Sequence, residues 1–194
     1  MKSYISEQIV EAQRVMGDMS ADSRLMTVLE NAASACIASL NADGKILLAG
    51  NGGSAADAQH IAGELVSRFA FDRPALPAIA LTVDTSILTA IGNDYGYEKV
   101  FYRQVQAHGI KGDIFIGYST SGRSPNILLA LEEARRRGLI CIGLTGNRGG
   151  PMGELCDYLL EVPSSDTPKI QEGHLVLGHI LCGLVESEIF KAKA

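Results

Sequence analysis

The chain lacks the features that mark nucleic-acid-binding, secreted or membrane proteins. Its 194 residues carry 17 Lys and Arg against 22 Asp and Glu, a net charge of −5, so no positive excess exists to bind a phosphate backbone. No continuous apolar core follows Lys2, which argues against a secretion signal. The longest apolar stretch, Leu175 to Val185, is eleven residues long and too short to cross a bilayer. We therefore expect no nucleic acid and no membrane partner.

Paired cysteines and a nucleotide P-loop are also missing. The four cysteines lie far apart without a Cys-x-x-Cys pair, which argues against a disulfide or zinc–cysteine framework and favours buried thiols in a reducing, cytoplasmic setting. No G-x-x-x-x-G-K-[ST] motif occurs, which excludes the common NTP-binding loop. The length and the 46% apolar content predict one domain covering 1–194. The four cysteines are Cys36, Cys141, Cys156 and Cys182.

Hydrophobic spacing divides the chain into two parts. Ile5, Ile9, Ala12 and Val15 follow a 3.6-residue period, which predicts helices over 1–43 with an apolar face that packs on a neighbour. From 44 to 194, short apolar runs alternate with helical patterns, which predicts a five-stranded parallel sheet flanked by helices, an α/β three-layer sandwich. The expected strands are Ile46–Ala49, Ala78–Thr82, Ile114–Tyr118, Leu139–Leu144 and Tyr158–Val162.

The segment "AGNGGSAAD" follows the first expected strand. Gly50, Gly52 and Ala55 match the G-x-G-x-x-G/A pattern of dinucleotide-binding folds, which leaves a dehydrogenase as one alternative. Such a site also needs an acidic residue about twenty residues after the glycines. Asp84 ends the next strand but lies further along the chain, so this alternative is weak.

The segment "STSGRSPN" follows the third expected strand. It places Ser119, Thr120, Ser121 and Ser124 around Gly122, with Pro125 where a helix should begin. Free amides at a helix N-terminus and short hydroxyls together favour binding of a phosphate group. The alternative is an ordinary serine-capped turn.

His60 and Glu64 lie four residues apart on an expected helix, and therefore on one face of it. A surface ion pair is one interpretation of this spacing. Ile61, Ala62 and Leu65 around the pair are small or apolar, which predicts a buried helix on which an unpaired carboxylate would be costly. A metal ion or a polar substrate between the two side chains would offset that cost.

An ordered set of motifs resembles the sugar isomerase (SIS) fold and, within it, the sedoheptulose 7-phosphate isomerases, or phosphoheptose isomerases. The set comprises "GNGGS", "HIAGE", "GNDYG", "STSG.S.N", "LTG..GG" and "IQEGH....H", and it spans nearly the whole chain. The resemblance implies a cytoplasmic homotetramer with active sites at subunit interfaces. It also implies conversion of D-sedoheptulose 7-phosphate to D-glycero-D-manno-heptose 7-phosphate, the first step of bacterial ADP- or GDP-heptose biosynthesis, with one zinc ion per subunit.

The resemblance also implies which residues form the site. The metal ligands would be His60, Glu64, Gln171 and His179. Glu64 would be the catalytic base and His179 its acid/base partner. Substrate contacts would come from Asn51, Gly52, Gly53, Glu64, Asn93, Asp94, Ser119, Thr120, Ser121, Ser124 and Gln171. Non-enzymatic SIS proteins that sense phosphosugars or bind a replication initiator are the alternative class, and in these we expect Glu64 or His179 to be replaced.

Gln171 and His179 raise a geometric question because both are expected on one helix that begins near Pro168. Eight residues separate them by about 12 Å along a helix axis, too far for two ligands of one ion. We therefore predict that each site takes these two residues from different subunits. Alternatively, Gln171 lies in an irregular turn before the helix.

Overall fold

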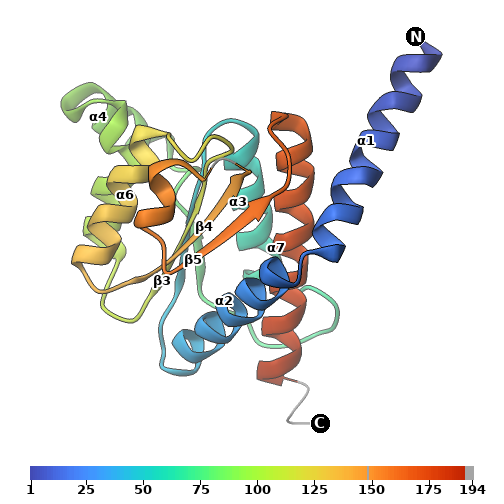
Figure 1. The fold of residues 1–194 in the computed structure, drawn as a ribbon. Coiled ribbons are helices and arrows are strands. Elements are labelled where there is room, and N and C mark those ends of the chain that lie inside the picture. Colours follow the sequence, from blue (N-terminus) through green and yellow to red (C-terminus); the bar gives the residue numbers. More distant parts are fainter. Residues whose placement is uncertain (148, 191–194) are drawn as a thin grey trace.

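The computed structural model describes residues 1–147 and 149–190, and it has the expected three-layer α/β architecture (Figure 1). Five parallel strands form one sheet in the order β2-β1-β3-β4-β5. The strands are β1 (Ile46–Ala49), β2 (Ala78–Ala80), β3 (Ile114–Tyr118), β4 (Ile140–Gly146) and β5 (Tyr158–Val162). The helices are α1 (Lys2–Ala21), α2 (Ser23–Asn41), α3 (Gly53–Val66), α4 (Thr85–Tyr95), α5 (Val100–His108), α6 (Pro125–Arg136) and α7 (Thr167–Phe190), with short 3₁₀ turns at Tyr97–Lys99 and Gly150–Glu154.

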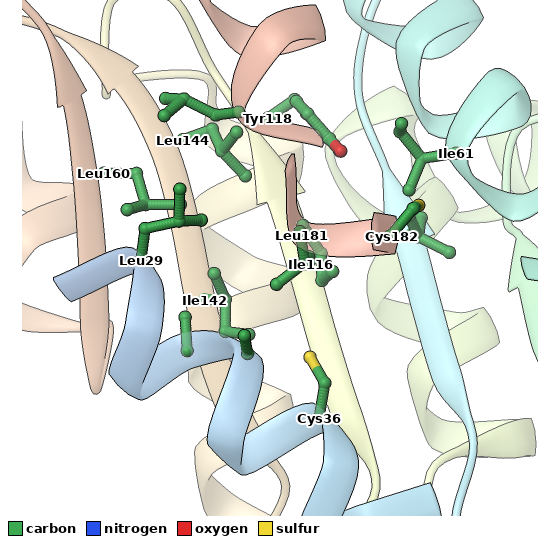
Figure 2. Close-up of a cluster of buried hydrophobic side chains, with 14 of the residues drawn as sticks. Leu29, Cys36, Ile61, Ile116, Tyr118, Ile142, Leu144, Leu160, Leu181 and Cys182 are labelled. Carbon is green, nitrogen blue, oxygen red and sulfur yellow. The ribbon is translucent and has the colours of Figure 1, made fainter. Parts of the chain in front are cut away.

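The sheet is central, and its inner strands β1, β3 and β4 are buried on both faces. All four residues of β1 and all five of β3 are buried, the pattern of a parallel sheet covered on each side. Successive side chains alternate, so that Leu48 packs with α2, α3 and α7, whereas Leu47 packs with α5 and α6. Figure 2 shows Leu29, Ile61 and Leu181 meeting the sheet residues Ile116 and Ile142 on the first of these faces.

The expected strands are confirmed, with shifts at the ends of β2 and β4. β4 covers Ile140–Gly146 instead of Leu139–Leu144. β2 ends at Ala80 instead of Thr82, although the Leu81 amide still donates to the Leu48 carbonyl at 2.8 Å. The chain then turns, and the Asp84 carboxylate accepts from the Ile87 amide as the N-cap of α4. That carboxylate therefore caps a helix and does not stand at a nucleotide ribose, which removes support from the dehydrogenase alternative.

The N-terminal segment is helical as predicted, and α1 projects away from the sheet (Figure 1). Its side chains Ile5 and Ile9 are 58% and 56% exposed in the single chain, and only Val15 and Met19 of this helix are buried. The α2 helix, in contrast, packs on β5 and α7 and contributes Leu29 and Cys36 to the core.

The cysteines are free thiols, as expected. Cys36, Cys141 and Cys182 are buried and Cys156 is half-buried. Figure 2 shows Cys36 and Cys182 among aliphatic side chains, and burial raises the pKa of the Cys36 thiol to about 12. A thiol held protonated in this way packs as a small apolar group.

The α7 helix is longer than the eleven-residue apolar run indicated. By length and composition alone, with a mean hydropathy of 1.2, it could cross a membrane. It packs instead against α2, α3 and the sheet, and its buried residues include the charged Lys169 and Glu186. These contacts are those of the core helix of a globular domain.

Candidate active site

The strand order places the two motif loops side by side. β1 and β3 are neighbours, and the chain leaves them toward opposite faces of the sheet, into α3 and α6. In open parallel sheets this reversal opens a crevice at the carboxyl ends of the strands, where ligands bind. The loop after β1 and the loop after β3 therefore flank the position where the fold predicts a ligand.

A polar cavity of about 310 Å³ lies between these loops. It is lined by Asn51, Gly52, Gly53, Ser54, Tyr118, Ser119, Thr120, Ser124, Thr167 and Gln171. These residues include the starts of three helices, because α3 begins at Gly53, α6 at Pro125 and α7 at Thr167. Three converging helix N-termini direct free amides and positive dipole ends into one space, which favours an anion such as phosphate.

The serine loop does not form an ordinary cap. Ser124 is the N-cap of α6, yet its hydroxyl makes no capping bond to the first turn. It lies instead 2.9 Å from the Ser119 hydroxyl. Ser121 accepts from the Arg123 amide at 3.2 Å. The cap interpretation is thus wrong for Ser124, and its hydroxyl faces the cavity together with that of Ser119.

The glycine loop is shaped by its backbone. Gly52 has a φ of 56° and precedes α3, a conformation that other residues adopt only with strain. Gly53 lies against the Gln171 side chain, whose amide nitrogen is 2.6 Å from where a Cβ would stand. A side chain at Gly53 would therefore displace Gln171 from the cavity wall.

Asn126, the last residue of "STSG.S.N", belongs to the site but was not predicted as a site residue. Its buried amide exchanges two hydrogen bonds with the Asn51 amide, at 2.9 and 2.8 Å, and the Tyr97 hydroxyl donates to Asn51 Oδ1 at 3.1 Å. This reciprocal pair joins the glycine loop to the serine loop. A side-chain amide carries both N–H donors and an acceptor oxygen, and its position at the end of a motif loop is the signal that could have found it.

His60, Glu64 and His179 form a second part of the site. The Nε2 atoms of His60 and His179 are 2.8 Å apart, and His60 Nε2 is 3.3 Å from Glu64 Oε1. One potential ligand atom from each residue lies within 4.8 Å of the others. A simple surface ion pair would not require the second imidazole, which comes from a different helix 119 residues along the chain.

The expectation of a buried helix around this pair is confirmed for only one face of the helix in the single chain. Ile61 and Leu65 are buried against the core, but the side chains of His60 and Glu64 are 46% and 25% exposed. The helix is amphipathic, because alanine and glycine also occupy its outer face. One turn earlier, burial raises the pKa of the Asp57 carboxyl, and the neighbouring His60 partly offsets this effect.

Gln171 lies within α7, so the alternative of an irregular turn before the helix is wrong. The α3 and α7 helices run side by side in the same direction, with Gln171 beside Gly53 and Gly178 beside Ile61. Gln171 therefore lines the phosphate-type cavity at the start of both helices, while the histidine–glutamate cluster lies about two turns further along.

Asn93 and Asp94 lie elsewhere on the chain, on the exposed side of α4. The Asn93 amide donates to the Asp94 carboxylate at 2.8 Å. The residues that line the cavity, in contrast, come from the two loops, β3 and α7.

The chain is similar to known proteins over nearly its whole length. The model of the SIS domain matches residues 10–146. A phosphoheptose isomerase of Burkholderia pseudomallei (strain 1710b) is 73% identical over 188 residues, which cover 97% of this chain and 95% of the relative. One of Aneurinibacillus thermoaerophilus is 58% identical and covers 100% of this chain and 98% of the relative.

The chain belongs to the phosphoheptose isomerase family of SIS-domain proteins. The solved structure of a family member from Neisseria gonorrhoeae superposes with a TM-score of 0.90 at 42% identity. The superposition covers 96% of this chain and 98% of that one. The fold of this chain is therefore that of the family.

Proposed function

We propose that this protein interconverts D-sedoheptulose 7-phosphate and D-glycero-D-manno-heptose 7-phosphate, at the start of bacterial heptose biosynthesis. The observation that carries this proposal is a cluster of one carboxylate and two imidazoles near a cavity that is lined by the N-termini of three helices. A protein that only binds a phosphosugar needs the cavity but has no use for the acid/base cluster. Membership of the phosphoheptose isomerase family supports the same substrate class.

The side chains suit the two proton transfers of an aldose–ketose isomerisation. Glu64 removes the C1 proton of the ketose, which gives a cis-enediolate, and later returns a proton to C2. His179 accepts the proton of the O1 hydroxyl and supplies one to O2, so that atoms and charge balance over the cycle. Its imidazole lies in the same cluster as the Glu64 carboxylate, and imidazole is suited to proton transfer near neutral pH.

The phosphate group lies, in this proposal, at the convergence of α3, α6 and α7. Ser119, Thr120 and Ser124 donate hydroxyl hydrogen bonds there. Ser121 lines a second cavity together with Thr120 and Arg123. Asn51, Gly52 and Gly53 provide the opposite wall. Phosphate binding of this kind orients the sugar and restricts its motion.

A divalent metal fits the donor set of His60, Glu64 and His179, and we propose that it is zinc. Two imidazole nitrogens and a carboxylate oxygen within 4.8 Å of one another match the ligand types that zinc prefers. When bound, zinc would supply Lewis-acid polarisation of the substrate carbonyl. Chelation should lower activity and zinc should restore it. Zinc titration should also shift the imidazole NMR signals of His60 and His179, and unchanged signals would contradict this site.

We further propose that the protein is a cytoplasmic homotetramer whose subunits, each a single 1–194 domain, share active sites. Gln171 and His179 lie on one straight helix, about 12 Å apart along its axis, so a ligand set that contains both is best completed by a neighbouring subunit. Asn93 and Asp94, exposed on α4, would reach substrate in the same assembly. Exposed apolar residues on α1 and α7, including Ile9, Val176 and Ile180, suit burial between subunits.

A complementation experiment tests the shared site. Gln171→Ala and His179→Ala should each be inactive, and refolding them together at equal concentration should restore about a quarter of the sites if sharing is pairwise. Mixed oligomers without any recovered activity would place both ligands on the same chain.

A direct assay tests the activity itself. The purified protein is incubated with D-sedoheptulose 7-phosphate and zinc, and the product is followed by NMR. We expect signals of an aldoheptose 7-phosphate. Binding of the sugar phosphate without turnover would instead favour a non-enzymatic phosphosugar-sensing or initiator-binding protein.

A further inference from the structure

A buried ion pair lies directly behind the acid/base cluster. Arg73, in the segment between α3 and β2, places its Nε atom 3.0 Å from Glu186 Oε1 near the end of α7. The two side chains are only 2% and 1% exposed. Removing two charges from water is costly, so such a pair persists only where further hydrogen bonds compensate.

Those further hydrogen bonds lead to the backbone of Glu64. Arg73 Nη2 donates to the Glu64 carbonyl at 2.9 Å, and Nη1 donates to the Leu65 carbonyl at 2.6 Å. Both carbonyls belong to the last turn of α3, where the helix itself supplies no donors. The guanidinium therefore holds the turn of α3 on which Glu64 stands.

The other half of the ion pair leads to His179. Glu186 lies seven residues after His179, two turns further on the same side of α7. Its carboxylate accepts from the Phe69 amide at 2.8 Å and from the Ala70 amide at 2.7 Å. The Phe69 ring packs over Gly183 and lies 5.7 Å from the His179 ring, centroid to centroid.

We propose that Arg73 and Glu186, together called the clamp, are positioning residues that fix the Glu64 carboxylate relative to the His179 imidazole. Neither residue touches the reacting atoms in this arrangement. Each acts through a neighbour: Arg73 through the backbone of Glu64, and Glu186 through Phe69. This inference rests on the proposed isomerase function for its kinetic consequence, but not for its geometric one.

A second buried carboxylate with similar hydrogen bonds provides a control that distinguishes a positioning role from a role in stability. Asp113 accepts from the amides of Lys45 and Ile110 at 3.0 and 2.9 Å, and from Lys45 Nζ at 2.6 Å. It directly precedes the central strand β3, and therefore lies at the amino ends of the strands, opposite the loops at their carboxyl ends. Asp113→Asn is therefore the matched control, since it weakens a comparable buried network away from the site.

Arg73→Lys is the sharpest variant, because lysine keeps the charge for Glu186 but loses the forked contacts to the two carbonyls. We expect kcat to fall by about 10- to 100-fold, since small displacements of catalytic groups have effects of this size. KM should change by less than about twofold, because no substrate contact is lost. Asp113→Asn should lower the melting temperature without this loss of kcat.

An NMR measurement reads the geometry without turnover. The chain has four histidines, and the imidazole signal of His179 is identified by its loss in His179→Gln. In Arg73→Lys that signal should move as Phe69 loosens, while the signal of the exposed His108 stays in place. If the wild-type protein proves inactive on sugar phosphates, the proposed function fails, but this measurement still tests the clamp.

Two results would overturn the proposal. One is a folded Arg73→Lys protein with the kcat of Asp113→Asn, and the other is an unmoved His179 signal. Should Arg73→Lys fail to fold, Glu186→Gln provides the same two readouts, because glutamine keeps the volume but cannot accept from both amides while facing Arg73. Unchanged kcat and an unmoved His179 signal in that variant would equally reduce the pair to a structural role.

Discussion

The amino ends of the strands and their carboxyl ends differ in how their polar side chains are paired. At the amino ends, Asp113 is held by two amides and Lys45, and the Asp157 carboxylate accepts from the Cys141 amide at 2.8 Å. At the carboxyl ends, the hydroxyls of Ser119 and Ser124 bond mainly to each other and line an open cavity. Polar groups satisfied by the protein stabilise the fold, whereas those directed into a cavity are available to a ligand.

The acid/base cluster differs in the same way from the ion pair of Arg73 and Glu186. His60, Glu64 and His179 are partly exposed, and one potential ligand atom of each lies within 4.8 Å of the others. Behind them, the Glu186 carboxylate is fully bonded. Burial raises its pKa, but the Phe69 and Ala70 amides and the Arg73 guanidinium outweigh this effect and lower the pKa below its ordinary value. Variants in the two classes should therefore fail in different ways.

The largest effect is expected at the open carboxylate. Glu64→Gln keeps the volume of the side chain and removes the base, so turnover should fall at least about 100-fold while the protein stays folded. Steady-state kinetics and circular dichroism measure the two quantities. Glu132→Gln, the same change on the exposed face of α6, should have no effect. Near-normal rates in Glu64→Gln would show that another group is the base.

The second effect concerns how the stability of the fold depends on pH. It arises from His174, a buried imidazole on α7. Both of its ring nitrogens are buried, and the Thr145 backbone makes only a weak contact with the ring. Burial lowers its pKa from 6.5 to about 4, and the Thr145 backbone offsets this only in part. Between these values the unfolded chain binds a proton that the folded chain does not, so stability falls as pH decreases through this window.

This loss should reach about 3 kcal/mol between pH 7 and pH 4. His174→Phe keeps an aromatic ring against Tyr118, whose ring centroid is 5.9 Å away, and should flatten the dependence. Urea unfolding at several pH values measures it, with His108→Gln as the exposed control. An unchanged slope in His174→Phe would assign the acid sensitivity to other groups.

Much of this molecule was predictable because its signals are local. β1, β3 and β5 were found to the residue. For β1 and β3 the reason is that a strand buried on both faces is continuously apolar. The two loops were found because glycine and serine between a strand and a helix have few other uses. The burial of α3 was predicted correctly for Ile61, Ala62 and Leu65 but not for the opposite face, because a small residue such as Gly63 fits an exposed face as well as a buried one.

The remaining features depend on contacts between distant segments. Asn51 and Asn126 are 75 residues apart, and Arg73 and Glu186 are 113 apart, so no local pattern links them. The position of Gln171 at the cavity, two turns from the histidine cluster, follows from the parallel packing of α3 and α7. That packing is set by small contacts, such as Gly178 against Ile61, which periodicity alone does not reveal.

A smaller effect is expected at the amino edge of the sheet. Asp113→Asn removes the charge that binds Lys45 and two amides, and should lower the free energy of unfolding by about 2 kcal/mol. Because this edge is remote from the cavity, kcat and KM should remain those of the wild type. Urea unfolding and steady-state kinetics measure the two quantities. A raised KM with unchanged stability would mean that Asp113, at the amino ends of the strands, affects the cavity at their carboxyl ends.

The smallest effect is expected when a single hydroxyl is removed at the carboxyl ends of the strands. Ser124→Ala removes the oxygen that lies 2.9 Å from Ser119 and lines the cavity. We expect KM to rise about tenfold and kcat to change less than about twofold, because the phosphate is a remote, non-reacting part of the substrate. The melting temperature should hardly change, since Ser124 makes no capping bond to α6. Ser34→Ala, which removes an exposed hydroxyl that bonds to the Glu30 carbonyl, is the control. A fall in kcat alone would argue against a phosphate loop. A clear loss of stability would show that this hydroxyl stabilises the fold, as the buried carboxylates at the amino ends of the strands do.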